Sequence, residues 1–130
     1  ISVDDDEVNQ EVVQAILAPK GFQLSIAMDG ASCLDLMNKA VAEGRLPRCI
    51  LLDSMMPGMS GLDVCKQLRT QFSPLQLPII MLTCRTSPEE VAAALQMGVN
   101  DYVKKPFNNV ELTARIHKQM ELAQERTDYI

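Results

Sequence analysis

The chain has 130 residues, the size of one domain, which is long enough to bury a substantial core. Twelve Lys and Arg residues stand against seventeen Asp and Glu, and the net charge of −5 argues against direct contact with nucleic acid or an anionic membrane, because such contacts need clustered positive charge. The apolar runs are short and no basic segment precedes one at the start, so we expect no membrane span and no secretion signal. The expected location is cytoplasmic, with a cytosolic domain of a larger membrane-anchored protein as the alternative.

The four cysteines, Cys33, Cys49, Cys65 and Cys84, contain no CxxC pair, and the single histidine, His117, lies far from them in the sequence. A zinc site normally shows two closely spaced pairs of ligands. Three of the cysteines fall within apolar patterns, where a free thiol behaves as a small hydrophobic group. We therefore expect reduced, buried thiols, with a thiol enzyme as the weaker alternative.

Hydrophobic periodicity alternates between a strand-like and a helical spacing along the whole chain. Strands are predicted at 1–3, 22–28, 49–52, 79–82 and 102–103. Helices are predicted at 8–17, 33–41, 62–68, 88–97 and 109–123. Residues 19–21 (Pro-Lys-Gly) end the first helix, Ser87 with Glu90 begins the fourth, and Asn108 with Glu111 begins the last. The runs at 49–52 and 79–82 are continuously apolar, which is typical of strands that are buried on both faces of a parallel sheet.

Five successive β/α units predict an α/β fold, a parallel sheet covered by helices on both faces and joined by right-handed crossovers. Ligands of such sheets bind outside the carboxyl ends of the strands. Five polar residues stand at or just beyond predicted strand ends, and we expect them to meet at one edge of the sheet: Asp4, Asp5, Asp53, Thr83 and Lys105.

Three carboxylates in one pocket repel each other, so a positive group has to hold them together. Oxygen ligands favour a hard cation, and Mg²⁺ takes one or two carboxylates while keeping waters or phosphate oxygens. Thr83 offers a hydroxyl donor and Lys105 a positive charge suited to phosphate. The set fits phosphoryl transfer, with a central carboxylate as the nucleophile that forms an aspartyl phosphate.

Each of these residues also has a simpler interpretation. Residues 4–6 are all Asp, and acidic residues favour helix N-termini, where they cap the first turn. Thr83 also fits an ordinary strand end, and Lys105 an exposed lysine before a turn. Their common placement after strands favours the functional interpretation, because the simpler one requires several independent coincidences.

Four segments, in order, resemble the receiver domain of two-component response regulators, and the resemblance covers essentially all 130 residues. They are an acidic stretch at 3–6 (VDDD), a phosphoacceptor loop at 51–61 (LLDSMMPGMSG), a switch segment at 81–83 (MLT) and the signature at 101–107 (DYVKKPF). The chain looks most like receivers of hybrid histidine kinases or of other multidomain sensor proteins. The resemblance implies a flavodoxin-like fold, a doubly wound five-stranded parallel sheet in the order 2-1-3-4-5.

By this resemblance, Asp53 accepts a phosphoryl group from the phosphohistidine of a partner kinase. Asp5 and Asp53 bind Mg²⁺ directly, together with the backbone carbonyl of Met55, while Asp4 acts through water. Lys105 pairs with Asp53 and then with the phosphoryl oxygens.

Thr83 is implied to move in to hydrogen-bond the phosphoryl group, with Tyr102 turning inward behind it. The resulting shift reaches a surface formed by the fourth helix, the fifth strand and the fifth helix. The resemblance also predicts a cis bond between Lys105 and Pro106, and autodephosphorylation at a rate that Met55 and Arg85 tune. The domain would not be a conventional enzyme, since it catalyses only its own phosphorylation and dephosphorylation.

We assign residues 1–123 to the receiver domain and residues 124–130 to a helical extension or the start of a linker to another domain. The expected partners are a histidine kinase or a phosphotransfer domain, in the same polypeptide or another, and a downstream output domain or protein. Glu111 and Arg115 match charged positions that some receivers use to dimerise, but no basic partner occurs at 87–98, so we expect a monomer or a weak dimer.

Three other functions fit the sequence less well. A pseudo-receiver, which never takes a phosphate, would lack Asp53 or Lys105. An aspartate-nucleophile phosphatase would have a second acid two residues after the nucleophile, where this chain has Met55. A flavin carrier would have a phosphate-binding loop after the first strand, whereas residues 4–6 are acidic and repel phosphate when no metal is present.

Overall fold

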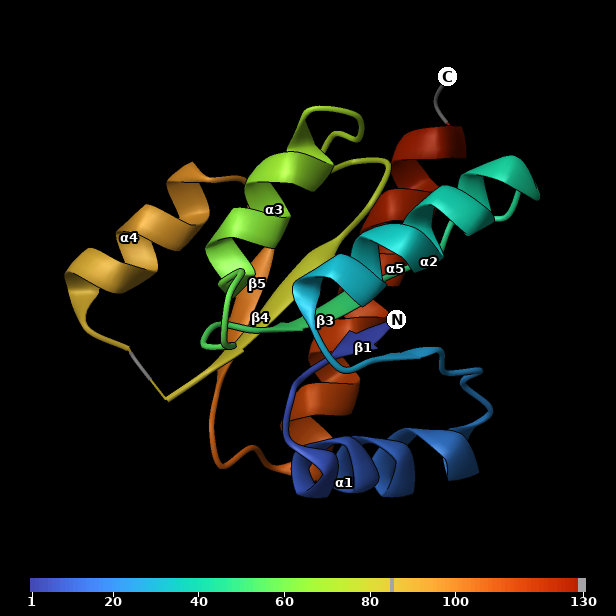
Figure 1. The fold of residues 1–130 in the computed structure, drawn as a ribbon. Coiled ribbons are helices and arrows are strands. Elements are labelled where there is room, and N and C mark those ends of the chain that lie inside the picture. The colour runs from blue at the N-terminus through green and yellow to red at the C-terminus, as the bar shows by residue number, and fades with distance from the viewer. Residues whose placement is uncertain (85, 129–130) are drawn as a thin grey trace.

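The computed structural model describes residues 1–84 and 86–128, with side chains up to residue 122. Five strands and five helices alternate along the chain (Figure 1). In chain order they are β1 (Ser2–Val3), α1 (Glu7–Leu17), the 3-10 turn η1 (Ala18–Lys20), β2 (Ile26–Ala27), α2 (Gly30–Ala42), β3 (Ile50–Asp53), α3 (Gly61–Arg69), β4 (Ile79–Thr83), α4 (Pro88–Gln96), β5 (Asp101–Lys104) and α5 (Asn109–Asp128).

The strands form one parallel sheet in the order β2-β1-β3-β4-β5. This order confirms the predicted doubly wound, flavodoxin-like fold. Every residue of β3 and β4 is buried, as the continuously apolar runs at these positions predict. The order reverses between β1 and β3, so the carboxyl ends of these two neighbours flank the crevice in which such sheets bind ligands.

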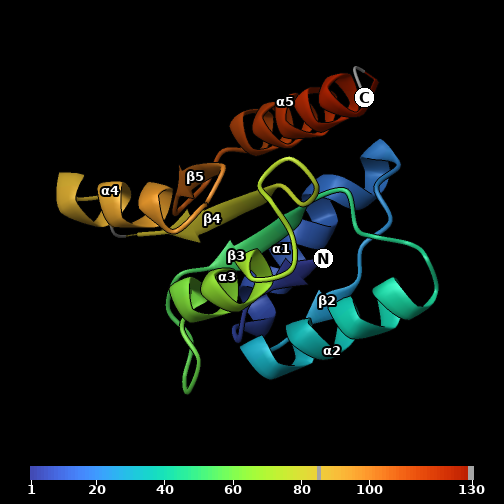
Figure 2. The same ribbon diagram turned by 90° about the horizontal axis from the view of Figure 1, so that it is seen from above.

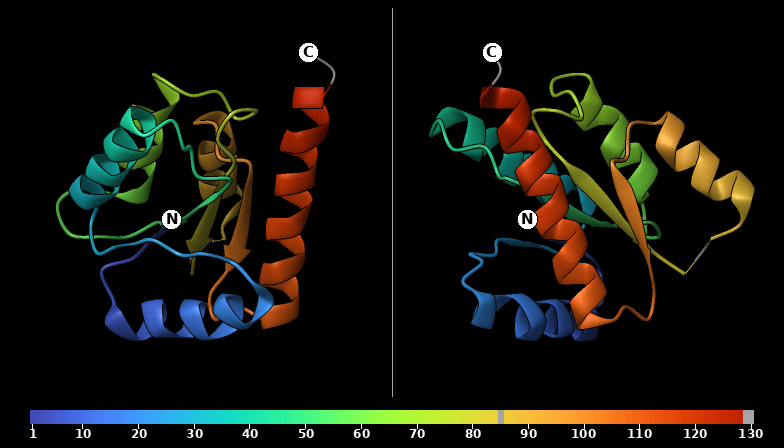
Figure 3. Two further views of the ribbon diagram at one scale, coloured as in Figure 1. Left: turned by 90° about the vertical axis from the view of Figure 1, so that its right-hand side faces the viewer. Right: turned by 180° about the vertical axis from the view of Figure 1, so that it is seen from behind.

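Helices cover both faces of the sheet, with α2 and α3 on one side and α5 on the other (Figure 3). Alternate residues of the central strands supply the two resulting cores, because successive side chains of a strand point to opposite faces. Ile50 and Leu52 of β3 belong to the core beneath α2 and α3, whereas Leu51 belongs to the core beneath α1 and α5. The view from above shows the same layers, with α4 at the margin beside β4 and β5 (Figure 2).

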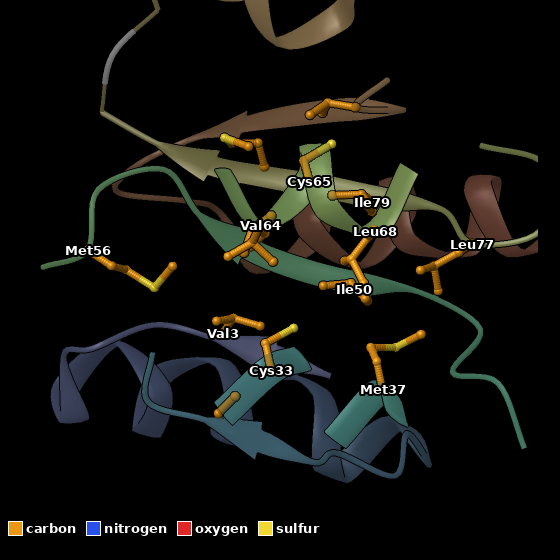
Figure 4. Close-up of a cluster of buried hydrophobic side chains, with 14 of the residues drawn as sticks. Val3, Cys33, Met37, Ile50, Met56, Val64, Cys65, Leu68, Leu77 and Ile79 are labelled. Carbon is orange, nitrogen blue, oxygen red and sulfur yellow. The ribbon is translucent and has the colours of Figure 1, made fainter. Parts of the chain in front are cut away.

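The larger core is built from side chains of several elements that pack without any charged group (Figure 4). Its labelled members are Val3, Cys33, Met37, Ile50, Met56, Val64, Cys65, Leu68, Leu77 and Ile79. Most of them are 0–3% exposed, so they gain close to the full hydrophobic free energy of burial. This core holds α3 against β3 and thereby fixes the loop that leads from β3 to α3.

The helix boundaries follow their capping residues. Asp6 caps α1 by accepting hydrogen bonds from the N–H groups of Val8 and Asn9. Ser87 and Asn108 cap α4 and α5, as the sequence predicts, and Gly21 at φ +86° ends η1. The interpretation of residues 4–6 as acids that cap the first helix is therefore correct for Asp6.

The second strand is shorter than predicted. Only Ile26 and Ala27 pair with β1, through Ser2 and Val3, whereas the alternating pattern predicts a strand over 22–28. As an edge strand, β2 pairs only with β1, which is itself two residues long, so the ladder cannot extend further. Residues 22 and 24 lie outside the strand and pack against the core beneath α1 and α5.

The helix α5 continues to Asp128, beyond the end at residue 123 that the periodicity predicts. The assignment of residues 124–130 to an extension stays a prediction, and residues 129–130 lie outside the described residues. Within the described part of the chain, no helix combines the length and the apolar character needed to cross a bilayer.

Candidate functional site

Polar residues gather at the carboxyl edge of the sheet. Asp4 follows β1, Asp53 is the last residue of β3, Thr83 is the last residue of β4, and Lys105 follows β5. The backbone N–H of Lys105 donates to the carbonyl of Thr83 at 2.8 Å, which fixes the start of the loop after β5 against the end of β4. The Lys105–Pro106 bond is cis, as the resemblance predicts.

The ammonium group of Lys105 joins two of the carboxylates. Its Nζ lies 2.8 Å from Asp53 Oδ1 and 3.2 Å from Asp4 Oδ2. The two acids are almost fully buried, at 6% and 3% exposure, so both ion pairs are shielded from water. Removing Lys105 would leave both buried carboxylates without their cation, which is strongly unfavourable.

A third carboxylate completes the cluster. One ligand oxygen from each of Asp4, Asp5 and Asp53 lies within 4.8 Å of the other two, and Asp5 is exposed while the other two are buried. The donors are all hard oxygen atoms, a set that suits Mg²⁺. Asp4 Oδ1 also accepts the N–H of Asp6 at 3.0 Å, which orients this carboxylate within the loop after β1.

The charges in the pocket are unbalanced, because three carboxylates meet one lysine. The pKa of Asp53 is raised above its ordinary value, mainly because burial penalises the charged carboxylate, and repulsion from Asp4 adds to this; hydrogen bonds from Lys105 and from the N–H of Met55 act in the opposite direction. The pKa of Lys105 is also raised, because attraction to Asp53 and Asp4 outweighs the larger single effect, its own desolvation. The two shifts agree with one physical situation, a pocket whose described residues carry excess negative charge, so that it retains Lys105 firmly and would accept a further cation.

Gln10 anchors the acidic loop, and the sequence analysis did not identify this residue. Its Nε2 lies 3.1 Å from three carbonyl oxygens, those of Ser2, Asp4 and Ala27, and its Oε1 accepts the hydroxyl of Ser2 at 2.7 Å. The side chain therefore ties α1 to the ends of β1 and β2. The sequence carries a signal for this role, because Gln10 lies three residues before Val13 and so shares its face of α1. The structure shows that this face points inward, with Gln10 only 3% exposed.

The loop between β3 and α3 is held close to the phosphoacceptor position. Gly61 begins α3, and a Cβ at this position would overlap the carbonyl oxygen of Asp53. Ser60 and Asp63 form a reciprocal capping box at the start of the same helix. This close approach explains why the loop needs glycine directly after the serine that caps α3.

Ser54 follows β3, Thr83 ends β4 and Tyr102 lies in β5, and the three residues face a common cavity. The hydroxyl of Ser54 donates to Thr83 Oγ1 at 2.9 Å, a contact that the sequence does not reveal because the register between β3 and β4 creates it. All three residues line a mainly apolar cavity of about 630 Å³, together with Met55, Met56, Pro57, Ser60, Leu62, Met81, Glu90, Val91, Ala93 and Ala94. Tyr102 is half-buried at its wall.

All four cysteines are free, and the environments of three of them argue against thiol chemistry. Cys33 and Cys65 are buried and Cys49 is half-buried. Burial raises the pKa of Cys33 to about 11 and of Cys49 to about 12, and it raises that of Cys65 as well, so these thiols stay protonated and poorly nucleophilic at neutral pH. Cys84 is exposed next to Thr83. Arg85, named in the sequence analysis, lies outside the described residues.

The fold and the site define a class of protein. It is a doubly wound α/β domain with a buried carboxylate at the carboxyl edge of its sheet, where a lysine, two further carboxylates and a nearby threonine suit phosphoryl chemistry. Comparison with known proteins places the chain within this class.

Residues 1–117 match the family model of the response regulator receiver domain. The chain is 41% identical over 118 residues to the DNA-binding response regulator MtrA of Mycolicibacterium smegmatis, which covers 91% of this chain and 48% of that protein. The chain thus spans about half the length of the curated relatives it matches. Among solved structures it resembles the chemotaxis protein CheY4 of Vibrio cholerae, with a TM-score of 0.80, 32% identity and coverage of 90% of this chain and 93% of that one.

A second solved structure, of a putative two-component response regulator with a GGDEF domain, has a TM-score of 0.86 and 27% identity and covers 95% of this chain and 49% of that one. The chain belongs to the response regulator receiver domain family. The general function of this family is that of a phosphoryl-accepting switch in two-component signalling.

Proposed function

We propose that Asp53 is the phosphoacceptor of this receiver. The observation that supports this assignment is the pairing of its buried carboxylate with Lys105 Nζ at 2.8 Å, beside two further carboxylates at the carboxyl edge of the sheet. A buried carboxylate next to a fixed cation is oriented for attack, and the cation neutralises charge that develops on the transferred group.

In the proposed step, a carboxylate oxygen of Asp53 attacks the phosphorus of a phosphohistidine. The new O–P bond forms as the P–N bond breaks, and the electron pair of the P–N bond returns to the imidazole nitrogen of the donor. Lys105 stays beside the acceptor carboxylate and holds an oxygen of the phosphoryl group. Autodephosphorylation is the later attack of water on the same phosphorus, which restores the carboxylate and releases inorganic phosphate.

We assign the cation site to Asp5, Asp53 and the backbone carbonyl of Met55, with Asp4 acting through water. The oxygens of the three carboxylates are close enough together to share one ion, and the excess of negative charge favours binding. A bound Mg²⁺ would neutralise the carboxylates and the phosphoryl oxygens. Asp4 suits the indirect role because Lys105 and the N–H of Asp6 already occupy its two oxygens.

The proposed output is a rearrangement of α4, β5 and α5, with Thr83 and Tyr102 as the switch residues. Both line the cavity between α3, β4 and α4, so a movement of either changes the surroundings of α4. Ala94 is the only residue of α4 that is buried, and a helix with so small an anchor can shift at low cost. The weak anchoring of α4 supports its assignment to the surface that responds.

The proposed phosphodonor is a histidine kinase or a phosphotransfer domain, in the same polypeptide or in another. Next to the site, α1 lies beside the first turns of α5 (Figure 3). These elements expose apolar side chains, with Val8 64%, Val12 42% and Val110 71% exposed. A helix with an apolar stripe could pack there and present its phosphohistidine to Asp53.

The partner downstream is an output domain or protein. MtrA is a DNA-binding response regulator, but this chain matches only about half of it, and we propose that the present domain does not itself contact DNA or a membrane. Arg115 is engaged within the chain by Asp101 at 2.9 Å and Glu111 at 3.2 Å, in keeping with a monomer or weak dimer. We further propose a cytoplasmic location.

The domain proper would comprise residues 1–123, with 124–130 as a helical extension or the start of a linker. The match to the family model covers residues 1–117, whereas α5 continues to Asp128. A chain ending at residue 123 that matched the full chain in phosphorylation and in oligomeric state would argue against a signalling role for the extension.

Intact-protein mass spectrometry with acetyl phosphate tests the proposed function. We expect a gain of one phosphoryl group that requires Mg²⁺ and is absent from Asp53→Asn. Asp63→Asn is the matched control and should still gain the phosphoryl group, because the carboxylate of Asp63 forms part of the capping box of α3. An adduct that persisted in Asp53→Asn would overturn the assignment of the site.

A further inference from the structure

The hydroxyl of Ser54 donates a hydrogen bond to the hydroxyl of Thr83 at 2.9 Å. Ser54 directly follows Asp53, and Thr83 ends the neighbouring strand, so the bond links the phosphoacceptor strand to the switch residue. In this chain the hydroxyl of Ser54 therefore engages one of the two proposed switch residues.

The backbone of Ser54 is fixed on both sides. Its N–H donates to the carbonyl of Leu82 at 3.1 Å, and its carbonyl accepts the N–H of Gly61 at 3.1 Å. A Cβ on Gly61 would lie 3.0 Å from the Cα of Ser54, which shows how closely α3 approaches. Ser54 therefore presents its hydroxyl to Thr83 from a position that its backbone hydrogen bonds fix.

The bond faces the cavity and not the acidic pocket. Ser54 and Thr83 both line the cavity of about 630 Å³ beneath α4, whereas among the described residues neither Asp53 nor Lys105 belongs to its lining. The hydrogen bonds that Asp53 accepts come from Lys105 and from the N–H of Met55. The Ser54–Thr83 hydrogen bond is thus made on the cavity side.

We infer that Ser54 is a positioning residue that holds Thr83 in its resting orientation, so that the Ser54–Thr83 hydrogen bond has to be exchanged for a bond to the phosphoryl group when the switch turns on. This inference rests on the proposed function of Asp53. To hold a phosphoryl oxygen, Thr83 Oγ1 has to come within about 3 Å of it, which takes the hydroxyl away from the cavity wall. Loss of the Ser54–Thr83 bond makes activation less favourable by the net free energy of one hydrogen bond.

The first test is a titration with beryllofluoride and Mg²⁺, a stable mimic of the phosphorylated state. Ser54→Ala removes the resting bond, so we expect about fivefold tighter binding, the factor that one net hydrogen bond corresponds to. Ser54→Thr keeps a hydroxyl and should stay near wild type. In a Thr83→Val background, where the acceptor is gone, Ser54→Ala should have no further effect.

The second test follows Thr83 without any ligand. Three-bond NMR couplings to its Cγ2 should report the same dominant rotamer in wild type and in Ser54→Thr, and a lower population of that rotamer in Ser54→Ala. Unchanged or weaker beryllofluoride binding by Ser54→Ala, or the same tightening in the Thr83→Val background, overturns the inference. A wild-type chain that binds no beryllofluoride overturns the proposed function instead, and the rotamer measurement then still decides whether Ser54 holds Thr83.

Discussion

Lys105 and Asp53 are 52 residues apart in the sequence, and their Nζ and Oδ1 atoms lie 2.8 Å apart in the structure. The contact exists because β3 and β5 flank β4 in the same parallel sheet and end at the same edge. The lysine also reaches Asp4, so a single cation serves two buried carboxylates. The pocket therefore keeps an excess of negative charge.

Replacing Lys105 by Met should slow phosphorylation by acetyl phosphate by roughly 100-fold, because a fixed charge that stabilises the transferred group is lost. The same change should tighten Mg²⁺ binding, since the carboxylates then lack their cation. The neighbouring Lys104 is exposed and provides the control, as Lys104→Met should alter both quantities by no more than about twofold. Stopped-flow phosphorylation and calorimetric Mg²⁺ titration measure the two effects, and equal losses in the two variants would refute the role of Lys105.

Asp5 and Asp6 are adjacent acids with different expected contributions to metal binding. Asp5→Asn should weaken Mg²⁺ binding about tenfold or more, because a carboxylate of the cluster is lost. Asp6→Asn should leave the affinity nearly unchanged, since Asp6 caps α1 and Asn caps helices equally well. Isothermal titration calorimetry makes the comparison, and a larger loss in Asp6→Asn would contradict the assigned ligands.

The raised pKa of Asp53 predicts how stability depends on pH in Mg²⁺-free buffer. A carboxyl with a pKa raised by folding stabilises the protein below its unfolded pKa, and this contribution is lost as the pH rises through the folded value. Asp53→Asn, which is uncharged at every pH, should therefore be more stable than wild type at pH 7. The difference should shrink as the pH falls through the raised pKa. Urea unfolding at several pH values measures it, and a variant less stable than wild type at pH 7 would show that the ion pair with Lys105 dominates.

Gly61→Ala should lower the free energy of unfolding by about 2 kcal/mol, because the added Cβ overlaps the carbonyl oxygen of Asp53 and the backbone has to move. Gly30→Ala is the matched control at the first position of α2. Its Cβ would meet side-chain atoms of Val64 at 2.7 Å and Met59 at 2.9 Å, a milder overlap than the one with the backbone at Gly61, so the loss should be smaller. Equal losses, measured by urea unfolding, would contradict the special role of the backbone approach at Gly61.

Much of this architecture is predictable from local patterns. The continuously apolar runs before Asp53 and Thr83 indicate buried parallel strands, and the rule that ligands bind at carboxyl ends then brings the polar residues to one edge. The structure places Asp4, Asp53 and Lys105 in contact there. The strand order and the cis bond before Pro106 agree with the family resemblance.

Contacts that depend on register and on neighbouring elements are not predictable in this way. The Ser54–Thr83 bond arises from the pairing of β3 with β4, and the bonds of Gln10 arise from the way α1 packs over the ends of β1 and β2. The length of β2 is set by its two-residue neighbour β1 and not by its own alternating pattern. In each case the deciding partner is distant in sequence.

The most direct test of the central claim locates the phosphoryl group. After treatment with acetyl phosphate and Mg²⁺, borohydride reduces an aspartyl phosphate to homoserine and leaves free carboxylates intact, and peptide mass spectrometry then identifies the reduced position. We predict homoserine at position 53 alone, in a Mg²⁺-dependent yield. Reduction at Asp4, Asp5 or any other acid in place of Asp53 would contradict the account of the site.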